Sequence, residues 1–186
     1  MRIISGKFKG KKILEPKDKA TRPLKDLTKE SIFNIITHTN KFDTELSNSN
    51  VLDLFSGVGS FGLECLSRGS SYIIFVENYK EVLSVLKKNI SNMNFQEDTL
   101  IIEKDIVDSF NFEKIKEKID IIFMDPPYKD RNLSKLLIKI NNANILNHKG
   151  IIIIHRHKKE KDIFPENFNI IEEKIYGISK VIFGSF

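Results

Sequence analysis

Val51-Leu-Asp-Leu-Phe-Ser-Gly57-Val-Gly59-Ser-Phe-Gly62 is the stretch that decides the fold of this 186-residue chain. Four of its first five residues are apolar, which is typical of a strand covered on both faces of a sheet. The three glycines that follow are spaced Gly-x-Gly-x-x-Gly. Glycine at such positions lets the backbone turn tightly and approach a ligand closely. The stretch therefore predicts a strand, a ligand-binding turn and a helix, in that order.

Strands and helices continue to alternate along the rest of the chain. Short apolar runs predict further strands at 72–76, 99–102, 119–124 and 150–154, and apolar spacing near 3.6 predicts helical segments at 79–92, 112–118 and 133–140. Such alternation is typical of an α/β fold with a doubly wound, mostly parallel sheet. Two strand-like runs within 168–186 are expected to pair antiparallel at its edge, which makes seven strands.

The positive charge of the chain is concentrated near its N-terminal end. The net charge is +5, but residues 1–25 hold nine basic residues against two acidic ones, so they carry +7 and the rest of the chain carries −2. Apolar pairs around Gly6 and Gly10 predict a short hairpin or extended ribbon, and a helix is expected to open near Pro23 and Asp26. We therefore expect a basic hairpin and helix in 1–40 and a single globular unit in 41–186.

This basic arm suits contact with the phosphates of RNA, because clustered cations release counterions from a nucleic acid. Plain solvation of a charged surface is the alternative. The residues expected to contact RNA are Arg2, Lys7, Lys9, Lys11, Lys12 and Arg22.

Composition excludes several other classes of protein. No apolar run approaches the roughly 18 residues that a membrane span needs, and the first residues are too polar for a secretory signal. The single cysteine, Cys65, excludes an internal disulfide framework and a cysteine-based zinc site, and it indicates a cytoplasmic protein. His155 and His157, expected in a basic loop after the fifth strand, lack an evident third ligand, so we expect no metal.

Glu77 and Asp53 indicate which cofactor the glycine turn binds. Glu77 ends the second predicted strand, 20 residues after Gly57, where a carboxylate can accept hydrogen bonds from the ribose hydroxyls of a nucleoside. Asp53 lies inside the first strand, where its charge would repel a pyrophosphate but suits a sulfonium ion. S-adenosylmethionine is therefore favoured over NAD, although an NAD-dependent oxidoreductase with the same turn stays an alternative.

Asp125-Pro126-Pro127-Tyr128 directly follows the fourth predicted strand. The two prolines stiffen this loop, because each fixes φ and lacks an N–H group. The loop offers a carboxylate, backbone carbonyls and an aromatic ring at the carboxyl ends of parallel strands, where open α/β sheets bind ligands. Asp125 and the Pro126 carbonyl can accept the two hydrogens of an exocyclic base amine, and Tyr128 can stack on the base. We therefore expect methylation of a nucleobase nitrogen.

The two motifs together resemble the class I S-adenosylmethionine-dependent methyltransferases that modify amino nitrogens of nucleic-acid bases. Over essentially its full length the chain is similar to the RsmD family, which methylates the N2 amine of a guanine in 16S ribosomal RNA. The matching segments, in order, are 2–6, 10–16, 22–23, 30–34, 51–59, 64–69, Asn89, 125–128 and 176–177.

The resemblance implies a role for each matching site residue. The cofactor would be bound by Asp53, Phe55, Gly57, Gly59, Glu77, Asn78, Asp105 and Ile106, and the guanine amine by Asp125, Pro126, Pro127 and Tyr128. Segment 22–34 would close over the cofactor. Asp105 is equally well explained as a capping residue of a turn. The chain departs from the family pattern at Leu24, at Val58 and at 155–159.

The resemblance also implies the partner, which is 16S ribosomal RNA within a small-subunit assembly particle, bound by a monomer. Two other functions stay open at this point. An N6-adenine methyltransferase of RNA or DNA would use the same Asp-Pro-Pro-Tyr loop. A non-catalytic RNA-binding factor of ribosome assembly would keep the pocket without the reaction.

Overall fold

The computed structural model describes residues 1–16, 24–127 and 130–186. Arg22, Pro23 and Tyr128, which carry sequence predictions, lie outside this part. The helices are α1 (Asp26–His38), α2 (Ser60–Ser67), α3 (Lys80–Asn92) and α4 (Leu133–Ala143), and the strands are β1 (Asn50–Leu54), β2 (Tyr72–Glu77), β3 (Thr99–Glu103), β4 (Ile119–Met124), β5 (Leu146–His157), β6 (Asn169–Tyr176) and β7 (Ser179–Ser185). No helix of the described residues is long and apolar enough to cross a membrane.

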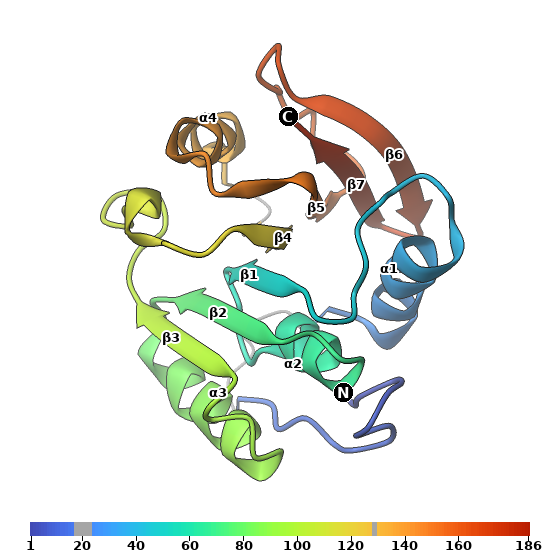
Figure 1. Ribbon diagram of the computed structural model, residues 1–186, viewed down its shortest axis with the longest axis vertical. Coiled ribbons are helices and arrows are strands. Elements are labelled where there is room, and N and C mark those ends of the chain that lie inside the picture. The colour runs from blue at the N-terminus through green and yellow to red at the C-terminus, as the bar shows by residue number, and fades with distance from the viewer. Residues whose placement is uncertain (17–23, 128–129) are drawn as a thin grey trace.

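Within the described residues the strands form one seven-stranded sheet in the order β3-β2-β1-β4-β5-β7-β6 (Figure 1). The first five strands along the chain are parallel, whereas β7 is antiparallel to both of its neighbours. This arrangement confirms the predicted α/β fold with a mostly parallel sheet. The predicted antiparallel pair at the edge is β6 and β7, joined by a turn in which Gly177 has a φ of +62°.

Apolar side chains leave the central strands on both faces, so the sheet separates two hydrophobic clusters. One row, in which Val51 is paired with Ile73 and Ile121, belongs to the cluster that also contains residues of α1, α2 and α3. The adjacent row, in which Leu52 is paired with Ile74, belongs to the cluster covered by α4. The unbroken apolar runs of the sequence are thus explained by burial on both faces.

The N-terminal segment forms a hairpin that packs against α2 instead of extending into solvent (Figure 1). Arg2 and Lys12 pair antiparallel, and Ile3 and Ile13 are fully buried in the same cluster as α1 to α3. At the tip of the hairpin, Gly6 lies so close to the end of α2 that a Cβ there would be 1.8 Å from the Ser67 carbonyl oxygen. A glycine is therefore required at this contact. The division of the chain at residue 40 stays a prediction.

Two sequence predictions differ from the structure. The helix expected at 112–118 is only a single 3-10 turn, Phe112–Lys114, because its apolar residues Phe112 and Ile115 cover one turn and no more follow until β4. The fifth strand continues past residue 154, since its last residues pair with β7. His155 and His157 therefore lie in β5 and not in a loop after it.

Candidate active site

A pocket of about 520 Å³ lies where the carboxyl ends of β1, β2, β4 and β5 meet. The segments that directly follow the first three of these strands form its wall, together with the end of β5, the start of α2 and the segment that precedes α1. The described lining residues are Met1, Pro16, Leu24, Lys25, Asp53, Phe55, Ser56, Gly57, Val58, Ser60, Phe61, Glu77, Asn78, Tyr79, Phe123, Asp125, Pro126, Pro127, His155 and Ser179.

The glycine turn connects β1 to α2 through left-handed backbone conformations. Phe55, Gly57 and Gly59 have φ values of 60°, 55° and 81°, which favour glycine over other residues. Phe55 and Gly57 line the pocket, whereas Gly59 is packed against α3: a Cβ on it would be 2.5 Å from Leu86 Cδ1. Of the predicted cofactor-binding glycines, Gly57 is therefore the one that borders the ligand space in the described structure.

Glu77 holds the turn together from the end of β2. Its carboxylate accepts hydrogen bonds from the backbone N–H groups of Gly57 (2.8 Å), Asn78 (2.9 Å) and Tyr79 (2.9 Å). An ionised carboxylate has roughly four acceptor positions, so with these donors in place about one is left for a ribose hydroxyl. Glu77 can therefore both shape the turn and receive a ribose.

Asp53 brings a buried carboxyl group to the pocket floor. Its side chain is 1% exposed, and its Oδ2 accepts the N–H of Gly62 at 3.0 Å. Burial raises the pKa of Asp53 well above its usual value, and the nearby carboxylates of Asp125 and Glu77 raise it further. A cation bound in the pocket would reverse this effect, since opposite charge favours the ionised form.

Asp125 and His155 meet at the same pocket wall. The distance between Asp125 Oδ1 and His155 Nδ1 is 2.8 Å, and both residues line the pocket. Pro126 and Pro127 continue this wall. The predicted amine-binding residues within the described chain are thus brought together, and Tyr128 lies outside it. Sequence reasoning placed His155 in a basic loop and did not assign it to the site, although a polar residue directly after four isoleucines was a detectable signal.

Asn78, Asp105 and Ile106 were predicted as cofactor-binding residues. Of these three, the described pocket wall contains Asn78 alone. Asn78 lines the pocket, and its Nδ2 donates to Asp105 Oδ2 at 2.8 Å. Asp105 also accepts the N–H groups of Val107 and Asp108, as a capping residue does. Asp105 and Ile106 are absent from the described pocket wall. Asp105 can therefore act on a ligand there through Asn78.

Within the described residues, the basic side chains predicted to contact RNA lie on the hairpin and face solvent. Arg2, Lys7, Lys9, Lys11 and Lys12 are exposed, and Arg22 lies outside the described residues. The ends of the hairpin, Met1 and Pro16, line the pocket, whereas its tip contacts the last residue of α2. The hairpin therefore runs from the pocket to the far end of α2, and its exposed lysines lie outside the pocket wall.

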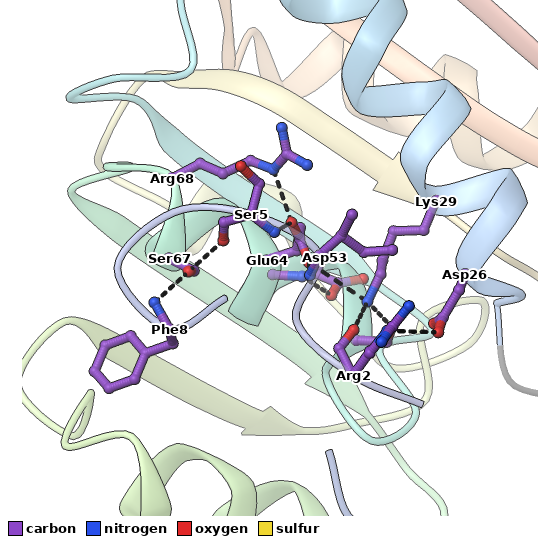
Figure 2. Close-up of polar contacts among 12 residues, drawn as sticks. Arg2, Ser5, Phe8, Asp26, Lys29, Asp53, Glu64, Ser67 and Arg68 are labelled. Carbon is purple, nitrogen blue, oxygen red and sulfur yellow. Dashed lines mark hydrogen bonds and ion pairs between the residues drawn. The ribbon is translucent and has the colours of Figure 1, made fainter. Parts of the chain in front are cut away.

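A buried polar cluster, defined here as Lys29 and Glu64 with their hydrogen-bond partners, joins the hairpin to α1 and α2 (Figure 2). Lys29 Nζ donates to the Arg2 carbonyl at 2.7 Å, and the Glu64 carboxylate accepts the N–H groups of Ile4 (2.7 Å) and Ser5 (2.9 Å). Sequence reasoning did not single out these two residues. The cluster holds α1, and with it the pocket-lining segment before it, in place.

The residues of the pocket fit S-adenosylmethionine. The buried carboxyl group of Asp53 suits its sulfonium and ammonium charges, Glu77 suits its ribose hydroxyls, and the rings of Phe55 and Tyr79 offer apolar surface to its adenine.

Comparison with known proteins supports this fit. The family model described as conserved hypothetical protein 95 matches residues 1–185. Ribosomal RNA small subunit methyltransferase D of Haemophilus influenzae is 30% identical over 179 residues, which are 96% of this chain and 90% of that protein. Its counterpart in Buchnera aphidicola is 31% identical over 174 residues, covering 93% and 86%. The solved structure of YhhF from Escherichia coli superposes with a TM-score of 0.82 at 22% identity, covering 99% and 96%.

The fold and the site define a class I S-adenosylmethionine-dependent methyltransferase. Within this class, the chain belongs to the conserved hypothetical protein 95 family, the family of ribosomal RNA small subunit methyltransferase D (RsmD).

Proposed function

We propose that the protein transfers a methyl group from S-adenosylmethionine to the exocyclic N2 amine of a guanine in 16S ribosomal RNA. The observation that carries this proposal is that Asp125, Pro126 and Pro127 line the same pocket as Asp53 and Glu77. An amine acceptor and a cofactor site thus share one space. The names of the relatives, which are ribosomal RNA small subunit methyltransferases, support RNA of the small subunit as substrate.

The chemistry that the cofactor supplies is a methyl group on a sulfonium, whose carbon–sulfur bond breaks as the new carbon–nitrogen bond forms. The nitrogen needs help, because its lone pair is delocalised into the guanine ring. Asp125 and the Pro126 carbonyl accept its two hydrogens and allow it to pyramidalise toward the methyl carbon. The proton leaves the nitrogen after methylation has acidified it, so Asp125 can take it without being a strong base. Catalysis then rests on positioning and on directed hydrogen bonds.

The basic hairpin completes the proposal by guiding RNA to the pocket. Its two ends line the pocket and its lysines are exposed, so they can contact phosphates of an RNA whose target nucleotide enters the pocket. We further propose that the protein works as a monomer in the cytoplasm and acts on a small-subunit assembly particle.

Mapping of 16S ribosomal RNA by mass spectrometry, in cells with and without the protein, tests the proposal. The expected result is the loss of one methyl group from one guanine. Methylation in vitro of guanine-only and adenine-only RNA with labelled cofactor separates this function from an N6-adenine methyltransferase. Naked 16S RNA and isolated assembly particles, compared as substrates, identify the natural one. Methylation of adenine alone would overturn the guanine assignment.

A further inference from the structure

The end of β5 extends beyond β4 and lies beside the Asp125 loop. Met124 and Ile154 are the last residues that pair between the two strands, and β5 continues to His157 through its pairing with β7. Residues 155 and 156 therefore stand next to the segment that begins at Asp125. Both are almost completely buried, with exposures of 5% for His155 and 1% for Arg156. Burying two strongly polar side chains is costly unless each has hydrogen-bond partners, so their contacts indicate what they do here.

His155 contacts the side chain of the loop. Its Nδ1 lies 2.8 Å from Asp125 Oδ1. Nδ1 of an imidazole can donate to this carboxylate, which as an ionised group only accepts hydrogen bonds. The imidazole therefore occupies one oxygen of Asp125 and limits the rotation of its carboxylate, which leaves Oδ2 for a substrate amine.

Arg156 contacts the backbone of the same loop. Its Nη1 donates to the Pro127 carbonyl at 3.2 Å, and its Nη2 donates to the Asp130 carbonyl at 2.8 Å. The guanidinium is itself held by Asp162, whose Oδ1 accepts from Nε at 2.9 Å. A planar guanidinium presents its donors in a fixed fork, so it sets the spacing of the two carbonyls. Asp162 is anchored further by Lys180, 3.7 Å away.

We propose that His155 and Arg156 are the positioning residues of the amine-binding loop. His155 orients the Asp125 carboxylate and Arg156 fixes the backbone on the far side of Pro126. This inference rests on the proposed role of Asp125 in binding the amine. The two prolines stiffen the loop internally, and the two β5 residues determine where the stiff loop is placed. A misplacement of about 1 Å in such a site can cost roughly 100-fold in rate.

The experiment uses His155→Phe, which keeps a ring of similar volume without a donor, and His155→Asn, which keeps a donor near Nδ1. Arg156→Lys keeps the charge but not the fork. His148→Asn and Arg131→Lys are matched controls, because they make the same changes at exposed positions. For each variant we would measure kcat and KM on guanine-containing RNA, cofactor affinity by calorimetry, and hydrogen exchange of the peptide that covers 125–130.

We expect His155→Phe to lower kcat by about 30-fold or more and Arg156→Lys by about tenfold, with KM and cofactor affinity within threefold of wild type. His155→Asn should keep kcat within threefold. Exchange at 125–130 should accelerate in His155→Phe and Arg156→Lys only. If His155→Phe does not fold, His155→Leu replaces it as the variant without a donor.

An unchanged kcat in His155→Phe, an equal loss in His155→Asn, or unchanged exchange at 125–130 would overturn the inference. A failure of the proposed function would instead be seen in the substrate specificity of the wild-type protein. Wild-type protein that methylates adenine alone, or no RNA at all, contradicts the guanine assignment. The exchange measurement would still decide whether His155 and Arg156 hold the loop.

Discussion

Lys29 and Glu64 form an ion pair, with 3.5 Å between Nζ and Oε2, in which both side chains are fully buried. Burial lowers the pKa of Lys29, an effect that the nearby Glu64 carboxylate opposes. Removal of one partner from a buried pair leaves an uncompensated charge, whereas an intact and hydrogen-bonded pair is tolerated. Since Glu64 also accepts two N–H groups of the hairpin, the pair fixes three segments at once.

Lys29→Met should lower the free energy of unfolding by about 1–3 kcal/mol, because the Glu64 carboxylate loses one of its two cations and the Arg2 carbonyl loses its donor. Arg68, whose Nε lies 2.8 Å from Glu64 Oε1, still compensates the carboxylate. Denaturation by urea, followed by circular dichroism, measures the change. Lys80→Met, at an exposed position of α3, is the control and should stay within about 0.5 kcal/mol of wild type. A loss below 1 kcal/mol for Lys29→Met would show that the pair is not structurally important.

Asp53→Asn should stabilise the cofactor-free protein and weaken cofactor binding. The pKa of Asp53 is raised in the folded state above the value of 3.8 expected for the unfolded chain. The free energy of unfolding of the wild type therefore falls as the pH rises above 3.8, because ionisation favours the unfolded chain. The asparagine side chain of the variant does not ionise, so the variant does not lose this stability. Its Tm should exceed that of wild type at pH 7 by about 2–4 °C for each kcal/mol of relieved penalty. The difference should vanish below pH 3.8. Cofactor affinity should fall about tenfold or more, because a charge-assisted contact is lost.

An equal Tm for the two proteins at pH 7 would contradict the raised pKa of Asp53. Asp108→Asn, a change at an exposed aspartate, controls for the general effect of removing one negative charge.

Asp125→Ala should lower kcat by about 100- to 1000-fold, a loss typical for the removal of a directed hydrogen bond to the reacting group. Cofactor affinity should stay within threefold of wild type, since Asp125 is proposed to hold the amine and not the cofactor. Single-turnover transfer of labelled methyl and calorimetry measure the two quantities. Full activity of Asp125→Ala would remove Asp125 from the mechanism and favour a binding protein without catalysis.

Replacement of Lys7, Lys9, Lys11 and Lys12 by Gln should weaken RNA binding and its dependence on salt. For about three lost phosphate contacts, the slope of log affinity against log salt should become shallower by about 2. Fluorescence anisotropy at several salt concentrations measures this slope. The control carries the same change at Lys104, Lys114, Lys116 and Lys135, which are exposed and lie elsewhere on the protein. Equal slopes for the two variants would exclude specific RNA contact by the hairpin.

Residue patterns at the strand ends predict the pocket well, because parallel topology forces those ends to meet. Asp53 lies in β1, Glu77 ends β2 and Asp125 directly follows β4, and each lines the pocket as the sheet order requires. Gly59 shows where such reasoning stops. Its left-handed φ was predictable from the motif, but whether it faces a ligand or α3 depends on packing that no motif encodes.

The contacts of His155 and Lys29 were not predicted from sequence because they depend on long-range pairing. The strand that carries His155 continues only because β7, more than 20 residues later, pairs with it. Lys29 looks like one more solvated lysine in a basic region, and its burial is decided by Glu64 and by the Arg2 carbonyl. Local patterns do not contain this information.

The docking of the hairpin onto α2 and α3 also determines the order in which the chain can assemble. The N–H groups of Ile4 and Leu14 are bonded to Glu64 and Asn89, which are 60 and 75 residues away in sequence. During synthesis the hairpin leaves the ribosome long before these partners exist, and closing such long loops is entropically slow. We therefore expect the hairpin to dock only after the elements from β1 to α3 have folded. Because Met1 and Pro16 line the pocket, the part of its wall that they form appears only after this step.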